Sequence, residues 1–261
     1  MQSCNVVIIG SGNVAEAFAR SIAKCDGVAL RQVFARNKER GEKLAQLYHT
    51  EWTCDIKNIA KADFYIIAVS DRSVAEVAQS LVVDSSAIIA HTAGSIAMEA
   101  IPERNGRRGI IYPLQSFTAG REITLDDVPL FIEADNEESN QRLSALASKL
   151  SSRIEYATSE RRRTIHLAGV FVNNFVNHLY ALGGDIIERE GLSFDILRPL
   201  IAETASKAIA SSDPRSVQTG PAIRGDKEVC QRQLSLLKSD ELKQQIYKSI
   251  TDSIWETSKR I

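Results

Sequence analysis

A short apolar run at residues 6–9 leads directly into Gly10, Gly12 and Ala15, which form the pattern G-x-G-x-x-A. Gly10 permits a tight turn, and Gly12 lacks a side chain, so a charged group can approach the backbone closely. Ala15 is small enough for a following helix to pack against the strand. The N–H groups and positive dipole end of that helix attract phosphate. We therefore expect a dinucleotide pyrophosphate to bind at Gly10, Ser11, Gly12, Asn13 and Val14.

Arg36 and Asn37 follow a strand predicted over 28–35, where dinucleotide-binding folds recognise the ribose. An acidic residue at this point would bind the 2′-hydroxyl of NAD. The segment reads FARNK and has no carboxylate, whereas a guanidinium can pair with a 2′-phosphate. The sequence therefore favours NADP over NAD. A solvated basic loop that binds nothing is the alternative interpretation.

Two further predicted strands end in polar loops. One loop contains Val69, Ser70 and Asp71, and the other contains His91, Thr92 and Ala93. Ligands of open α/β sheets lie outside the carboxyl ends of the strands, so both loops should line the cofactor crevice. For His91, a buried histidine that is satisfied at the end of its strand is an equally good interpretation.

The segment YPLQSF at 112–117 follows the next strand and could bring Gln115 and Ser116 toward the nicotinamide and the substrate. A turn shaped by its proline is the simpler alternative. Later in the chain, TGPAIRGD at 219–226 combines a rigid turn with Arg224, which could close the cleft over a substrate. The same segment could instead cap the helix that follows it.

A long predicted helix carries polar side chains at regular spacing. His166, Asn173 and Asn177 fall on one stripe of a straight α-helix, and Asn174 lies on the adjacent stripe. Amides on an apolar helix need hydrogen-bond partners, which a substrate, a neighbouring helix or a dimer interface could supply. An imidazole titrates near neutral pH, so His166 is the candidate proton donor. The three asparagines would then orient the substrate.

The elements that must position these residues alternate between strand and helix in the first part of the chain. Continuous apolar runs at 64–69, 86–90 and 109–112 are typical of strands covered on both faces. Further strands are expected at 129–133 and 153–156, on either side of a helix at 136–150. The fold class is therefore α/β, a doubly wound parallel Rossmann-like sheet.

Beyond residue 157 the strand-like runs end and helical patterns continue to the C-terminus. We expect a long helix to about residue 189, then helices at 194–211, 228–237 and 240–259. The predicted domains are accordingly a dinucleotide-binding domain at 1–157 and an all-α domain at 158–261. The second domain would serve the substrate and dimerisation.

Composition limits the possible partners. A net charge of −1 gives no electrostatic reason to expect nucleic acid or an anionic membrane surface. The apolar stretch at 167–187 is interrupted by three asparagines, a histidine and an aspartate, which would be costly in lipid. Four scattered cysteines without a C-x-x-C pair are typical of a cytoplasmic protein with neither disulfides nor a metal site. The first residues do not resemble a signal peptide.

Taken together, the motifs resemble those of pyrroline-5-carboxylate reductases and β-hydroxyacid dehydrogenases. They are most similar to an uncharacterised Rossmann-like oxidoreductase family with a second domain of unknown function. The segments that carry the resemblance are GSGNVA, HTAGS at 91–95, YPLQSF, VFVNNFVNH at 170–178 and TGPAIRGD. The resemblance implies a nicotinamide cofactor, in most members NADP, and a homodimer formed through the helical domain.

One departure limits what the resemblance implies. β-Hydroxyacid dehydrogenases carry a general acid/base lysine four residues before an asparagine of this helix, where the present chain has Gly169 or Val170. His166 is the nearest titratable replacement. The leading hypothesis is an oxidoreductase that transfers hydride between NADP(H) and a small carbonyl, imine or hydroxy compound. A non-catalytic NADP(H) sensor or scaffold, or a flavin or deazaflavin bound at the same turn, are the alternatives.

Overall fold

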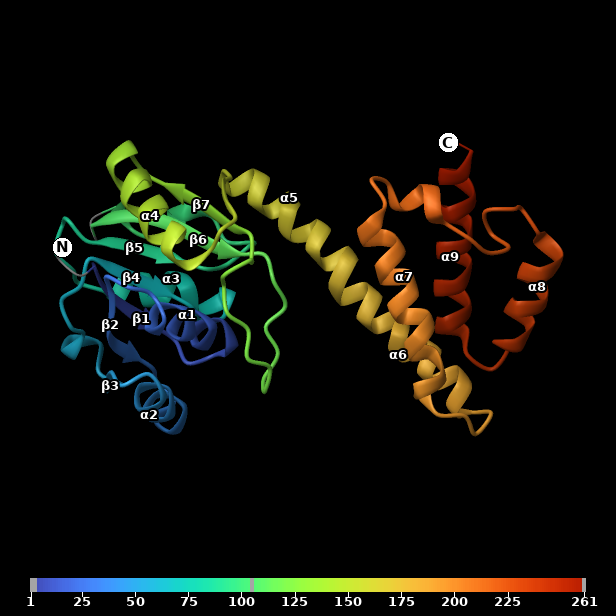
Figure 1. Ribbon diagram of the computed structural model, residues 1–261, viewed down its shortest axis with the longest axis horizontal. Helices are drawn as coiled ribbons and strands as arrows, with labels where there is room; N and C mark the ends of the chain where they lie inside the picture. The colour runs from blue at the N-terminus through green and yellow to red at the C-terminus, as the bar shows by residue number, and fades with distance from the viewer. Residues whose placement is uncertain (1–3, 104–105, 260–261) are drawn as a thin grey trace. The chain divides into compact units, whose positions relative to one another are not determined.

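The computed structural model describes residues 4–103 and 106–259, which form one mixed sheet followed by a series of helices (Figure 1). The sheet has eight strands in the order β3-β2-β1-β4-β5-β6-β7-β8. The strands are β1 (Cys4–Ile9), β2 (Val28–Phe34), β3 (Glu51–Thr53), β4 (Phe64–Ile67), β5 (Ile88–His91), β6 (Arg107–Pro113), β7 (Leu130–Ala134) and β8 (Ile154–Tyr156). Their order from β3 to β6 is that of a Rossmann fold, which confirms the predicted class.

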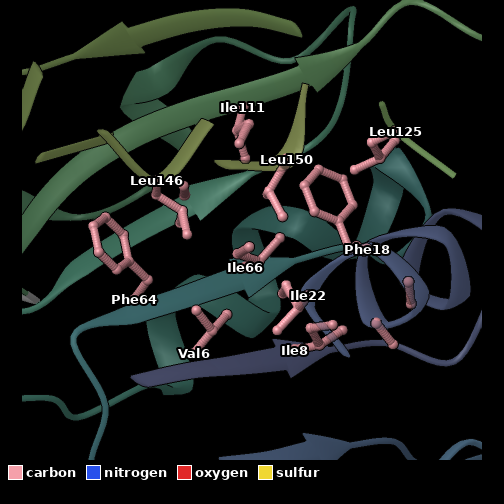
Figure 2. Packing of buried hydrophobic residues seen from close by; sticks show 14 of the residues in the cluster. Val6, Ile8, Phe18, Ile22, Phe64, Ile66, Ile111, Leu125, Leu146 and Leu150 are labelled. Atoms are coloured by element: carbon pink, nitrogen blue, oxygen red, sulfur yellow. The ribbon is translucent and has the colours of Figure 1, made fainter. Parts of the chain in front are cut away.

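Successive side chains of each strand point to opposite faces, and both faces are covered. Val6 and Ile8 pack under α1 (Asn13–Ala23) and α4 (Glu137–Leu150), with Phe18 and Leu146 in the same cluster (Figure 2). Val7 and Ile9 face the other side, where α3 (Asp71–Ser80) contributes Val77 and Leu81 lies just beyond its end. This two-sided burial explains why the central strands are apolar throughout.

The register of the central strands places their carboxyl ends in one row. Ile9 of β1 is paired with Phe34 on one side and with Ile67 on the other. Ile67 is in turn paired with His91, and His91 with Ile110. The loops that follow β1, β2, β4 and β5 therefore leave the same edge of the sheet, as the sequence predicts.

Two features of the sheet differ from the prediction. β7 runs antiparallel to β6, so the sheet is not wholly parallel. The chain between these strands, residues 114–129, contains no helix in the structure, and a parallel crossover generally needs one. The prediction also omitted β3, a strand of three residues on the edge beyond α2 (Lys38–Leu47), which is too short to produce an apolar pattern.

The predicted long helix is present but is not a uniform α-helix. It begins as α5 (Ser159–Gly169), passes through a π-helical segment, η4 (Val170–Phe175), and continues as α6 (Val176–Glu188). A π-helical turn contains more residues than an α-helical turn, so side chains beyond it occupy different faces from those of a straight α-helix. The π-helical segment includes both Asn173 and Asn174.

The remaining helices are α7 (Arg198–Ala210), α8 (Lys227–Leu236) and α9 (Glu241–Ser258). The chain divides into two compact units between Asn174 and Phe175. The division falls within the long helix, and α5 belongs to the first unit because it packs with the sheet through Ile165 and a buried Arg162. Among the described residues, no helix is both long enough and apolar enough to cross a membrane.

Candidate functional site

The glycine turn has the backbone geometry that its residue types predict. Gly10 has φ +132°, and a Cβ built on it would lie 2.2 Å from the carbonyl oxygen of Ala68. Only glycine fits where the end of β1 passes so close to the chain leaving β4. Gly12 is the N-cap of α1 with an ordinary φ of −83° and no side-chain cap. A Cβ on Gly12 would meet no atom within 4 Å, so the space above the helix N-terminus is open.

The remaining residues of the turn frame this open space. Ser11 and Val14 are partly buried, and Asn13 is exposed at the first position of α1. The Asn13 side chain donates a hydrogen bond of 2.9 Å to the carbonyl oxygen of Phe117. A free helix N-terminus beside an open glycine backbone fits a pyrophosphate, because N–H groups and the helix dipole both face it.

Arg36 and Asn37 have different roles at the end of β2. The Arg36 side chain is 67% exposed, and its nearest anion is Glu76, with 4.0 Å between Nη1 and Oε1. Its guanidinium is therefore available to an incoming phosphate. The Asn37 side chain caps α2 by accepting a 2.9 Å hydrogen bond from the backbone N–H of Arg40. That bond already occupies the side-chain oxygen of Asn37.

The loops after β4 and β5 are joined to each other. The Ser95 hydroxyl donates to the Asp71 carboxylate, and Ser70, next to Val69, occupies the N-cap position of α3 without a side-chain cap hydrogen bond. Thr92 donates to the carbonyl oxygen of Ile67 over 3.3 Å. These contacts fix the two loops at the same edge as the glycine turn.

His91 is completely buried, and both of its ring nitrogens contact its own loop. Nδ1 accepts from the Ala93 N–H at 3.2 Å, and Nε2 lies 3.4 Å from the carbonyl oxygen of Ala97. Burial lowers the pKa of His91 to about 4, so the ring is neutral. The side chain holds the loop in shape, and any contact with a cofactor here would come from the loop backbone.

A cavity of about 470 Å³ opens beside the start of the long helix, within the first compact unit. It brings together five of the predicted site residues from two segments of the chain: Gln115, Ser116, His166, Asn173 and Asn174. Tyr112 and a set of apolar residues complete the lining: Leu114, Ile165, Ala168, Gly169, Val170 and Val172. An apolar pocket with a few polar groups is typical of a small-molecule site.

The π-helical segment changes which amides share this cavity. A straight α-helix would place His166, Asn173 and Asn177 on one stripe, with Asn174 beside it. In the structure Asn173 and Asn174 both line the cavity with His166, because they lie in the π-helical turn. Asn177 lies on α6 in the second unit, and Arg224 belongs to the turn before α8 in that unit.

One part of the cavity wall is a contact between a tyrosine and a histidine. The Tyr112 hydroxyl lies 3.0 Å from Nδ1 of His166, and the two rings meet edge to face with centroids 5.9 Å apart. A Cβ on Gly94 would lie 2.7 Å from Nδ1 of His166 and 2.9 Å from Cε2 of Tyr112. Gly94 therefore has to be glycine for the two rings to reach this position.

A buried ion pair anchors the helix that carries His166. Arg162, one helical turn earlier, is completely buried, and its Nη1 donates to Oε2 of Glu133 over 2.6 Å. Its Nη2 donates to the carbonyl oxygen of Ile96, and Ser159 donates to the same Glu133 oxygen over 2.7 Å. The network therefore ties α5 to strand β7 and to the loop that contains Gly94.

The sequence analysis missed Tyr112, Gly94 and Arg162. Tyr112 ends an apolar strand pattern, and Arg162 stands between two other arginines at 161–163, so neither residue type points to the cavity. One signal was present, since Glu133 is a carboxylate inside the apolar strand LFIEA and needs a partner when buried. Nothing in the local pattern identifies Arg162 as that partner.

A second cavity, of about 370 Å³, lies at the opposite edge of the sheet, next to Asp63, Arg142 and Lys149. Its charged groups already bind backbone atoms: Arg142 donates to Ser86, Lys149 to Asp26, and Asp63 accepts from Asn5. Ligands of this fold bind at the carboxyl edge, so this cavity is not the candidate site.

The fold, the glycine turn and the cavity at the carboxyl edge define the class of Rossmann-type nicotinamide-dependent oxidoreductases. Residues 5–94 match the family described as NADP oxidoreductase coenzyme F420-dependent, and residues 128–254 match a domain of unknown function, DUF2520. BF3122 from Bacteroides fragilis, described as a putative NADP oxidoreductase, is 38% identical, covering 97% of this chain and 98% of that one with a TM-score of 0.89. The chain belongs to this family of NADP oxidoreductases.

More distant structures share the fold. TM1727 from Thermotoga maritima is 22% identical over 98% of both chains, with a TM-score of 0.75. The pyrroline carboxylate reductase of Plasmodium falciparum, solved with NADP bound, is 14% identical over 100% of this chain and 98% of that one, with a TM-score of 0.62. No curated protein matches the chain. The predicted family resemblance is thus confirmed, and NADP is the cofactor of the family.

Proposed function

We propose that this chain catalyses hydride transfer between NADP(H) and a small carbonyl, imine or hydroxy compound bound in the cavity beside His166. The observation that carries the proposal is a single loop that contacts both parts of the site. Ser116 lines the cavity, and the next residue, Phe117, accepts the hydrogen bond from Asn13 in the glycine turn. A cofactor held at the turn and a substrate in the cavity would therefore share one wall.

The residues at the carboxyl edge fit the cofactor. The backbone of Gly10–Val14 would hold the pyrophosphate, with Gly12 leaving the necessary space. Arg36 would bind the 2′-phosphate, and the loops carrying Ser70 and Thr92 would face the nicotinamide half. The bound cofactor supplies the hydride, while the protein orients the substrate and excludes water.

Within the cavity, His166 is the group that would donate to the substrate atom that gains a proton. Asn173 and Asn174 lie near it and would orient the same substrate through their amides. Gln115 and Ser116 would contact the substrate from the opposite segment. The assignment of Asn177 and Arg224 to substrate binding stays a prediction from the sequence, and neither residue lines this cavity.

We also propose that the protein is a homodimer assembled through its helical unit. This proposal is supported by large apolar side chains that α7 exposes, with Leu200 64% and Ile209 85% accessible. Such side chains are normally covered in a stable oligomer. All four cysteines are free thiols, which favours the reducing cytoplasm as the compartment. Sedimentation of the purified chain at several concentrations measures its mass, and a monomer throughout would contradict the dimer.

The test of the catalytic proposal is oxidation of NADPH, followed by absorbance, against a panel of ketones, aldehydes and cyclic imines. We expect turnover with at least one compound, and a loss of at least about a hundredfold in His166→Ala. His49→Asn is the matched control, because His49 has φ +50°, which asparagine tolerates, and lies outside the site. Binding of NADPH without turnover of any compound would indicate a sensor instead.

A further inference from the structure

Tyr112 is a core residue of the sheet whose hydroxyl contacts His166. It lies on β6, is 8% exposed, and stacks on Phe131 of β7 with ring centroids 6.4 Å apart. The core therefore fixes the ring, and its hydroxyl reaches out of the core to Nδ1 of His166 at 3.0 Å. A rigid strand thus makes a direct polar contact with the candidate catalytic side chain.

The Tyr112 hydroxyl can act as the donor of this hydrogen bond. Burial raises the pKa of the Tyr112 hydroxyl, and the charge of Asp71 raises it further, while Arg162 lowers it. The net shift is upward, so the hydroxyl keeps its proton at neutral pH and is able to donate it to Nδ1 of His166. Among the described residues, Nδ1 of His166 is the hydrogen-bond partner of this hydroxyl. A neutral imidazole accepts at one nitrogen and carries its proton on the other.

We propose that Tyr112 is a positioning residue that holds His166 in the tautomer protonated at Nε2, so that Nε2–H donates a hydrogen bond that orients and polarises the substrate. The acceptor on the substrate is the carbonyl oxygen or imine nitrogen that is reduced, and in this respect the inference rests on the proposed function. Tyr112 acts through His166 and gives up no proton itself.

The surroundings of the pair support this arrangement. The space over Nδ1 and Cγ of His166 is closed by Gly94, where a Cβ would lie 2.7 and 2.8 Å from these two atoms. Nδ1 is thus packed against Tyr112 and the loop, which leaves Nε2 as the nitrogen that can serve a ligand. The ion pair of Arg162 with Glu133 holds α5 one turn earlier and so keeps His166 in register with Tyr112.

The experiment is nitrogen NMR of the full chain labelled with ¹⁵N-histidine, recorded at pH 8 without cofactor. The chain has four histidines, and His166→Gln assigns the signal of interest by its loss. We expect His166 to show an unprotonated Nδ1 and a protonated Nε2. In Tyr112→Phe the ring packing is kept but the donor is lost, so the signals should move toward a mixture of both tautomers.

Tyr65→Phe is the matched control, because Tyr65 is a buried sheet tyrosine whose hydroxyl bonds only backbone, accepting from Ala62 and donating to Ala60. We expect its His166 signals to be those of the wild type. A protonated Nδ1 in the wild type would overturn the inference, and so would unchanged tautomer signals in Tyr112→Phe. The spectrum requires neither cofactor nor turnover, so its outcome is independent of the assay that tests the proposed function.

Discussion

The two halves of the candidate site are built in different ways. The phosphate turn is made by consecutive residues, and its shape depends on backbone atoms and on the absence of side chains at Gly10 and Gly12. The cavity is made by side chains from distant parts of the sequence, with Tyr112 and His166 54 residues apart. A buried ion pair, rather than a turn, holds it together.

Because the two halves are built independently, a substitution in one half should leave the structure of the other unchanged. A change in the turn acts on cofactor binding or on the close approach of β1 and β4. A change in the ion pair acts on the position of α5 and therefore on His166.

The largest effect is expected for Arg162→Met. The change leaves the Glu133 carboxylate buried without its guanidinium, and breaking such a pair costs about 3–5 kcal/mol of unfolding free energy. Urea denaturation measures the loss, with Arg163→Met as the control because Arg163 is exposed. The double variant Arg162→Met with Glu133→Met should recover much of the stability. Equal stability of the two single variants would show that the ion pair does not anchor the helix.

Gly10→Ala should destabilise the fold by distorting the glycine turn. Its Cβ would lie 2.2 Å from the Ala68 carbonyl oxygen at a φ of +132°, so the strands must move apart. We expect a loss of about 2–4 kcal/mol of unfolding free energy. The matched control is Gly183→Ala, whose Cβ would meet its nearest atom at 3.6 Å. Denaturation curves that coincide for these two variants would contradict the strained turn.

His91, at the end of β5, should make the unfolding free energy depend on pH. Its pKa falls from an ordinary 6.5 to about 4 on folding, so in acid the unfolded chain binds a proton that the folded chain does not. The unfolding free energy should therefore be largest above pH 6.5 and fall by about 2 kcal/mol between pH 6.5 and 5. His91→Asn removes the titrating group, and its stability should change less over this interval. If the unfolding free energy of both proteins changed equally with pH, His91 would not be the group responsible.

The smallest effect is expected at the edge of the turn, for Arg36→Ala. Loss of one exposed charge-assisted hydrogen bond should weaken NADPH binding by about tenfold and leave NADH binding almost unchanged. Titration followed by nicotinamide fluorescence measures both dissociation constants. If both cofactors weaken equally, Arg36 does not recognise the 2′-phosphate.

The glycine turn could be predicted from the sequence more completely than the cavity, because the turn is local and the cavity is not. The strand-turn-helix at residues 6–23 is local, so its pattern and spacing identify it directly. Tyr112 lines the cavity but was not predicted, whereas five other residues that line it were predicted for the site: Gln115, Ser116, His166, Asn173 and Asn174. The π-helical turn that adds Asn174 to the cavity, and the pairing of Arg162 with Glu133, depend on tertiary packing. No short-range pattern encodes either of them.

Binding of the NADPH pyrophosphate at the glycine turn is tested most directly by calorimetric titration of the wild type and of Gly12→Ala with NADPH at moderate ionic strength. A Cβ on Gly12 meets no atom within 4 Å, and the φ of Gly12 is ordinary, so the melting temperature of the variant should equal that of the wild type. The added methyl group would nevertheless occupy the space of the pyrophosphate. We expect saturable binding by the wild type and a loss of affinity of at least about tenfold in the variant. Absence of binding by the wild type, or equal affinity in both proteins, would contradict this expectation.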